Sequence, residues 1–200
     1  MNAINWLKEH REETRFADQA FKLTSYTGRM LLLAGVPGVS HLVPVAKLRD
    51  IVWGLNAIRD LSSLGQWISE WDQKDNWTRF ERVVVTFIRI NFLTKSALRV
   101  AALFSQNPYL LQVKRASTIA AMCAVLVMDG EGVVKTLWKR EEPSHRIALS
   151  LIDNAFDFAN TSMDLELLPA DEIPYAVTGF ISAVAGFTSA SLDIYNKKCR

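Results

Sequence analysis

The feature that most constrains this chain is an uncharged stretch near its C-terminus. Nineteen consecutive residues, 174–192, contain no Asp, Glu, Lys, Arg or His, while Asp171 and Glu172 precede them and basic residues follow within 193–200. A membrane-spanning helix needs about 20 predominantly apolar residues. The stretch is therefore just long enough to cross a bilayer, although its serines and threonines also suit a buried core helix. The charge asymmetry favours a crossing with the basic tail on the cytosolic side.

Apolar residues recur every three or four positions through much of the remaining chain, which is the period of an α-helix. Thr78 and Glu81 have the spacing of a capping box, in which each side chain satisfies a free backbone amide at a helix start. The pattern predicts three helices in the first half: 16–33, 48–68 and 79–104. No strand-like alternation competes with them. The sequence therefore predicts an all-α fold of about five to six helices.

The second half of the chain contains further helix signals. Proline at the first helical position predicts a helix that starts at Pro108, and glycine disfavours helix, so we expect an end at Gly130 and Gly132. Another helix is expected from Pro143, followed by irregular chain between 160 and 173 before the final helix. A length of 200 residues suits a single helical, membrane-associated unit.

Composition excludes several classes of protein. Half of the residues are apolar and 22% are charged, and the mean hydropathy is +0.08, which lies between soluble enzymes and polytopic transporters. A net charge of +2 is too small to indicate a nucleic-acid partner. Every residue from 8 to 13 is charged or histidine, unlike the apolar core of a secretory signal peptide. The two cysteines supply no disulfide framework, which fits a reducing compartment.

Candidate catalytic and metal-binding groups are few. Glu142 and His145 form one Glu-x-x-His pair, whereas a di-iron bundle needs two such pairs and two more carboxylates. Asp153 and Asp157 lie four residues apart on one helical face. That spacing suits either a paired-acid site or two like charges on a solvated face, and we interpret it as a solvated face. We therefore expect no enzymatic activity, no metal and no cofactor.

Three segments resemble the peroxin-11 family, whose members elongate and help divide peroxisomal membranes. The family's early helix has a Thr, then Gly-Arg-Asp-Lys, a basic residue, Gln-Tyr and a later Arg. In this chain five residues fall at that spacing: Thr14, Asp18, Lys22, Tyr26 and Arg29. The chain departs from the Gly-Arg-Lys part of the pattern, where it has Phe16, Ala17 and Gln19.

The second segment resembles the family's Arg-Lys-x-x-Arg-x-Gly-Lys, with Arg59 and Gly65 retained. Three other positions lack the family's basic residues: Asp60, Ser63 and Gln66. In the third segment, residues 179–186 have the family's Gly-apolar-apolar-Ser-small-x-x-Gly pattern, and a short basic tail follows. The three segments occur in the family's order and extend over nearly the whole chain.

The resemblance implies a peroxisomal or glycosomal membrane protein with both termini in the cytosol. Such a protein would promote membrane elongation, proliferation and fission, and would recruit dynamin-related fission machinery. Its amphipathic helix, within residues 1–35, would insert its apolar face into one leaflet while its cations attract anionic lipid headgroups. The expected membrane-binding residues are Phe16, Ala20, Phe21, Lys22, Leu23, Arg29 and Met30.

Small residues let membrane helices approach closely, so the final helix is also expected to form a homo-oligomer. The expected self-association residues are Gly179, Ser182, Ala183 and Gly186. Three alternatives stay open from the sequence. The chain is alternatively a soluble helical adaptor whose apolar stripes form its core, an enzymatic or metal-binding bundle, or a pore for small metabolites lined by the basic helix at 82–99.

Overall fold

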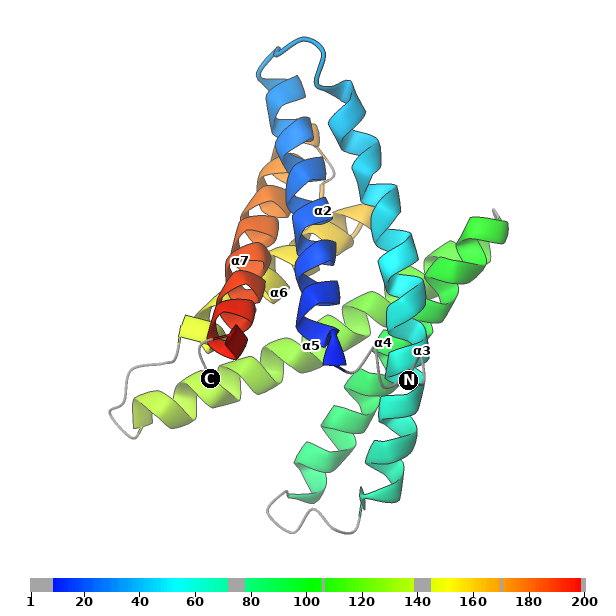
Figure 1. Ribbon diagram of the computed structural model, residues 1–200, viewed down its shortest axis with the longest axis vertical. Coiled ribbons are helices and arrows are strands. Elements are labelled where there is room, and N and C mark those ends of the chain that lie inside the picture. The colour runs from blue at the N-terminus through cyan, green and yellow to red at the C-terminus, as the bar shows by residue number, and fades with distance from the viewer. Residues whose placement is uncertain (1–8, 72–77, 106, 139–144, 170, 199–200) are drawn as a thin grey trace.

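The computed structural model describes residues 9–71, 78–105, 107–138, 145–169 and 171–198, referred to below as the described residues. They form six α-helices and one 3-10 helix (Figure 1). In chain order these are α2 (Arg11–Leu33), η1 (Ser40–Lys47), α3 (Leu48–Ser69), α4 (Arg79–Phe104), α5 (Pro108–Trp138), α6 (His145–Asp164) and α7 (Glu172–Lys198). The described residues contain no strand, so the predicted all-α fold is confirmed.

Local sequence signals explain where several helices begin and end. The predicted capping box opens α4: Thr78 Oγ1 accepts from the Glu81 backbone N–H at 3.2 Å, and Glu81 Oε2 accepts from the Thr78 N–H at 2.8 Å. After α2 the chain turns through Gly35 and Gly38, whose φ angles are +77° and +78°. Glycine adopts such angles at little cost because it has no β-carbon.

Two boundaries predicted from the sequence are wrong. α5 continues through Gly130 and Gly132 to Trp138. A glycine inside a helix costs only about 1 kcal/mol relative to alanine, and a helix of 31 residues has intrahelical hydrogen bonds on both sides to absorb that cost. The stretch predicted to be irregular from residue 160 is helical as far as Asp164.

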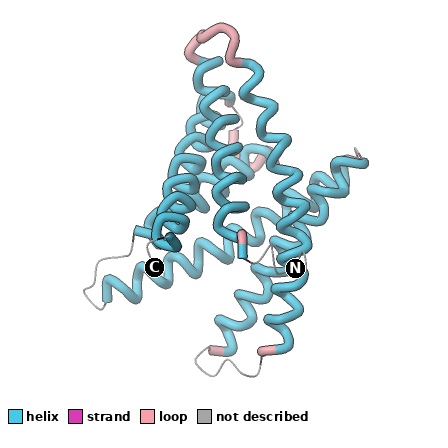
Figure 2. The backbone as a smooth tube through the Cα atoms, viewed as in Figure 1, coloured by secondary structure: helices cyan, strands magenta, loops and turns pink. Residues whose placement is uncertain are grey.

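Each helix from α3 to α7 packs against the next, and α2 packs against both α3 and α7 (Figure 1). The start of α2 lies beside the end of α7. Lys197 Nζ donates to the backbone oxygen of Glu9 at 2.7 Å and pairs with Glu13 at 3.1 Å. At this end of the bundle the α3–α4 hairpin extends beyond the start of α2 (Figure 2).

The interior of this bundle is polar. Asp18 and Lys22 are only 6% and 2% exposed, whereas no Leu, Ile or Phe among the described side chains is buried. The buried apolar residues are mostly alanines, joined by Val52, Trp67 and two methionines. Large apolar side chains lie on the outside, as the exposed fractions of 61% for Ile51 and 64% for Phe80 illustrate. Water-soluble domains have the opposite distribution.

Two described helical segments are long and apolar enough to cross a membrane: Pro108–Glu131 and Glu172–Lys197. The second contains the stretch predicted from the sequence. In the most apolar 18-residue stretch of each segment, only 22% and 39% of the residues, respectively, are buried inside the bundle. The core helix of a soluble protein is mostly buried, so the outward exposure of both segments favours contact with lipid.

Candidate functional site

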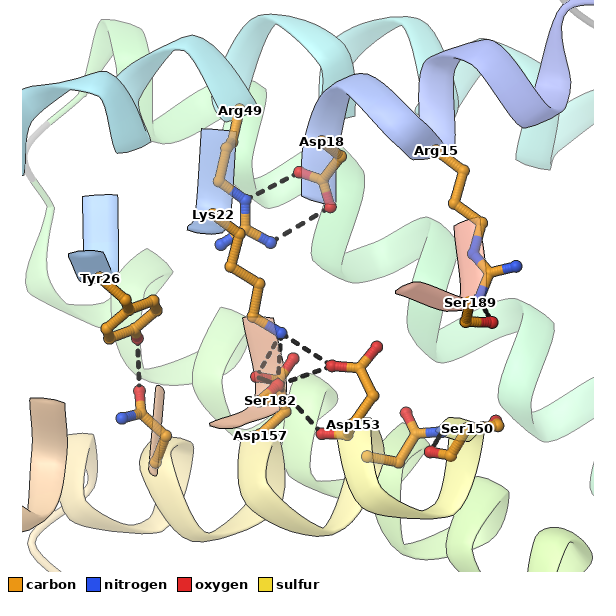
Figure 3. A network of polar contacts seen from close by, with 12 residues as sticks. Arg15, Asp18, Lys22, Tyr26, Arg49, Ser150, Asp153, Asp157, Ser182 and Ser189 are labelled. Atoms are coloured by element: carbon orange, nitrogen blue, oxygen red, sulfur yellow. Dashed lines mark hydrogen bonds and ion pairs between the residues drawn. The ribbon is translucent and has the colours of Figure 1, made fainter. Parts of the chain in front are cut away.

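A network of ion pairs and hydrogen bonds joins α2 to α3, α6 and α7 inside the bundle (Figure 3). Its α2 members Asp18, Lys22 and Tyr26 are spaced four residues apart, so they lie on one face of the helix. Ser25 and Gly28 are also buried on α2. The inward face of α2 is therefore a polar stripe, and its partners are polar or charged groups.

Lys22 is the centre of the network. Its Nζ lies 2.9 Å from Asp153 Oδ1, 2.6 Å from Asp157 Oδ1 and 2.5 Å from Ser182 Oγ. Ser182 is fully buried, and its hydroxyl lies within hydrogen-bond distance of both carboxylates. The interpretation of Asp153 and Asp157 as a solvated face is wrong, because the Lys22 ammonium lies between them and neutralises their repulsion. Such a buried cluster is tolerated only because each charge is paired and hydrogen-bonded.

Asp18 ties α2 to α3. Arg49 donates to it through two nitrogens, Nε to Oδ1 at 2.8 Å and Nη2 to Oδ2 at 3.2 Å, and the Trp53 indole N–H donates to Oδ1 at 2.9 Å. Paired hydrogen bonds between a guanidinium and a carboxylate are both strong and directional. The Asp18 carboxylate thus fixes how α3 lies against α2.

The remaining contacts hold α7 against α2 at both ends. Arg15 forms an ion pair with Asp193 and donates to Ser189 Oγ at 3.0 Å. At the other end the Tyr26 hydroxyl donates to Asn160 Oδ1 at 2.8 Å, and the Asn160 amide donates to the backbone oxygen of Tyr175 at 2.8 Å. The first described helix is thereby joined to the last over most of its length.

The residues predicted for self-association lie on the face of α7 that packs inside the chain. A β-carbon at Gly179 would overlap the Tyr26 ring, and one at Gly186 would lie 2.7 Å from Asp153 Oδ2. Ala183 is fully buried. In this conformation the small face of α7 allows close contact with α2 and α6, so a second chain could use it only if α2 moved away.

The residues predicted to bind membrane fall into two groups, those with contacts inside the bundle and those that are partly exposed. Lys22 is buried in the network, and Phe16 packs on Phe187 with ring centroids 5.0 Å apart. Arg29 lies over two aromatic rings, 5.9 Å from the centroid of Tyr26 and 5.4 Å from that of Tyr175. The other four are partly exposed: Ala20, Phe21, Leu23 and Met30. In this conformation the α2 surface offers lipid a smaller apolar area than the sequence suggests.

Sequence reasoning missed the interior role of Asp18 and Lys22. A signal was present, because Asp18, Lys22 and Ser25 form a polar stripe at helical spacing within an amphipathic helix. For metal binding, the described residues contain no group of three or more His, Cys, Asp or Glu side chains that could hold an ion. His145 is exposed at the start of α6, and Glu142 lies outside the described residues.

Two of the three segments singled out in the sequence, 14–29 and 179–186, lie against each other in space. Lys22 and Tyr26 of the first segment contact Ser182 and Gly179 of the third. Comparison of the chain with protein-family models, curated proteins and solved structures found no match. A functional assignment therefore has to come from the residues and their arrangement.

Proposed function

We propose that this chain is an integral membrane protein whose bundle lies in the bilayer with its apolar surface towards lipid. The observation that carries the proposal is the inverted distribution of side chains, with charged pairs inside and Leu, Ile and Phe outside. Ionisable residues within membranes face the bundle interior and pair with one another, as Lys22 and Asp157 do. In water, by contrast, such a bundle would lack the burial of large apolar side chains that drives folding.

The outer surfaces of α3 and α4 support this proposal. Each helix carries exposed apolar side chains at the spacing of one helical face, and these are between 39% and 64% exposed. They are Leu48, Ile51, Leu55, Ile58, Leu61 and Ile68 on α3, and Phe80, Val83, Phe87 and Ile90 on α4. Apolar faces of this kind insert into the acyl region of a bilayer.

The proposed topology places both termini in the cytosol. Two helical segments, in α5 and α7, are long and apolar enough to cross a membrane. The contacts of Lys197 with Glu9 and Glu13 keep the start of α2 beside the end of α7. An even number of traverses returns the chain to the side from which it started. The basic residues that follow α7 favour the cytosolic side for this end.

Within this membrane, the proposed activity is elongation, proliferation and fission of peroxisomes or glycosomes, and the resemblance of the three segments supports it. Insertion of the α3–α4 hairpin provides a physical route, because apolar faces that enter one leaflet expand that leaflet and favour curvature. Homo-oligomers and recruitment of dynamin-related fission machinery belong to the same proposal through the resemblance.

The test is to express the full chain with a fluorescent tag beside a peroxisomal marker, and to extract the membranes with alkaline carbonate. We expect the protein to stay in the membrane pellet, to coincide with the marker and to elongate the organelles when overproduced. Release into the supernatant would favour the soluble adaptor. A pellet protein on another organelle would retain the membrane assignment and overturn the peroxisomal one.

A further inference from the structure

The bundle contains a cavity of about 230 Å³ to whose wall all six described helices contribute. It adjoins a larger cavity of about 660 Å³, and the two share Arg49, Lys95, Met122 and Asp157 in their walls. The smaller cavity has six cationic lining residues, namely Lys22, Arg29, Arg49, Lys95, Lys114 and Arg115, against two carboxylates, Asp157 and Asp164. Positive charge is therefore in clear excess around this space.

Part of that charge is already neutralised. Lys22 pairs with Asp153 and Asp157, and Arg49 pairs with Asp18. Arg29 and Arg115 differ, because neither has a carboxylate of the described residues within ion-pair distance. Two guanidinium groups thus face one cavity without a carboxylate partner among the described residues.

Arg29 is held in place without the use of its hydrogen-bond donors. Its guanidinium lies over the rings of Tyr26 and Tyr175, and such cation–π contacts leave the N–H groups free for another acceptor. A guanidinium presents donors in a planar fork that matches the oxygens of a phosphate. Two arginines also suit a group that carries up to two negative charges.

We propose that this cavity is a binding site for a phosphate group, held chiefly by Arg29 and Arg115. The phosphate belongs to a small solute or to a lipid headgroup, since both present the same oxygens to the wall. A bound anion supplies the opposite charge that the wall lacks, and it connects α2 to α5 across the cavity. Asp164 opposes binding because its carboxylate repels the anion.

Isothermal titration calorimetry of the full chain in a maltoside detergent would measure binding of inorganic phosphate. Arg29→Gln and Arg115→Gln should each weaken binding by at least about tenfold, since a charge-assisted hydrogen bond is commonly worth that much. Arg79→Gln is the matched control, because Arg79 is exposed at the start of α4 and lies outside the wall. It should leave the affinity unchanged.

Asp164→Asn gives a second and independent readout. Removal of this carboxylate should strengthen binding, whereas a residue with a purely structural role would weaken it or have no effect. This variant tests whether the cavity binds phosphate even if Arg29→Gln fails to fold. Unchanged or weaker binding in Asp164→Asn would overturn the proposed site.

A second arm of the experiment distinguishes the two sources of phosphate. The chain is reconstituted in nanodiscs of phosphatidylcholine alone or with phosphatidic acid, and lipid bound to the repurified protein is measured. Binding of inorganic phosphate that depends on Arg115 identifies a solute site, and retention of phosphatidic acid that depends on Arg115 identifies a headgroup site. If neither ligand binds in a manner that depends on Arg29 and Arg115, the proposal is wrong.

Discussion

The ring of Tyr26 lies so close to Gly179 that no β-carbon fits between α2 and α7 at this point. The Tyr26 hydroxyl also donates to Asn160, which anchors the far end of the ring at 2.8 Å. The ring therefore cannot swing aside without losing a hydrogen bond. This contact fixes the register of α2 along α7.

Gly179→Ala should consequently lower the free energy of unfolding by about 1–3 kcal/mol, the usual cost of overpacking. Addition of Tyr26→Ala to this variant should relieve part of the added strain, because the missing ring leaves room for the methyl group. Thermal unfolding in detergent would measure the stability of the single and the double variant. Gly65→Ala is a matched control on the exposed side of α3, where a β-carbon meets no atom within 4 Å. Equal effects of the two alanines would contradict the close contact.

The same face allows a test of self-association. Gly179→Leu with Gly186→Leu should reduce crosslinking between chains in membranes if a second chain pairs through these glycines, while alkaline extraction reports whether both proteins remain inserted. Undiminished crosslinking with normal insertion would mean that the small face serves only packing within one chain.

Loss of one partner in the buried network should be costly. Lys22→Met should destabilise the bundle by about 3–5 kcal/mol, because it leaves the half-buried carboxylates of Asp153 and Asp157 beside each other without a cation. Further replacement of both carboxylates by Leu should restore much of the loss. Denaturant titration followed by circular dichroism is a suitable measurement.

The exposed pair of Lys197 and Glu13 provides the control for that measurement. A hydrogen bond from the backbone N–H of Glu13 and the nearby Lys197 ammonium lower the pKa of the Glu13 carboxyl below its usual value. The Glu13 carboxylate is therefore charged at neutral pH. Both side chains are 47% exposed. Lys197→Met should therefore cost less than about 1 kcal/mol, and a cost equal to that of Lys22→Met would contradict the role given to burial.

The outer face of α3 should determine membrane integration. Ile58→Asp with Leu61→Asp places two charges where the side chains are 52% and 61% exposed. Each charge should cost roughly 2.5–3.5 kcal/mol near the centre of a bilayer, so the variant should appear in the alkaline supernatant. Gln66→Asp with Ser69→Asp adds the same charges to polar, exposed positions of this helix and should stay in the pellet. If both variants stay in the pellet, α3 does not face lipid.

Protease protection checks the topology. A tag after Arg200 should be removed by protease added outside intact organelles, since the end of α7 is expected in the cytosol. A tag placed between Asp164 and Glu172, at the opposite end of α7, should be protected. Cleavage of both tags would show that α7 does not cross.

The sequence predicts the helices well because helical spacing and caps are local signals, as at Thr78 and Glu81. It does not predict the partner of Lys22, which lies 131 residues away in Asp153. Periodicity identifies a polar face, and the usual rule assigns such a face to water. On α2 that rule is wrong, because the polar face points into the bundle. The charged residues that it meets there are distant in sequence, and no local pattern predicts their positions.

The pairing of Lys22 with Ser182 across 160 residues has a consequence for biogenesis. α2 leaves the ribosome long before α6 and α7, and until they emerge Lys22 lacks its partners Asp153, Asp157 and Ser182. A nascent α2 would thus enter lipid without the partners that Lys22 has in the complete bundle. Insertion after α6 and α7 have been synthesised avoids that penalty.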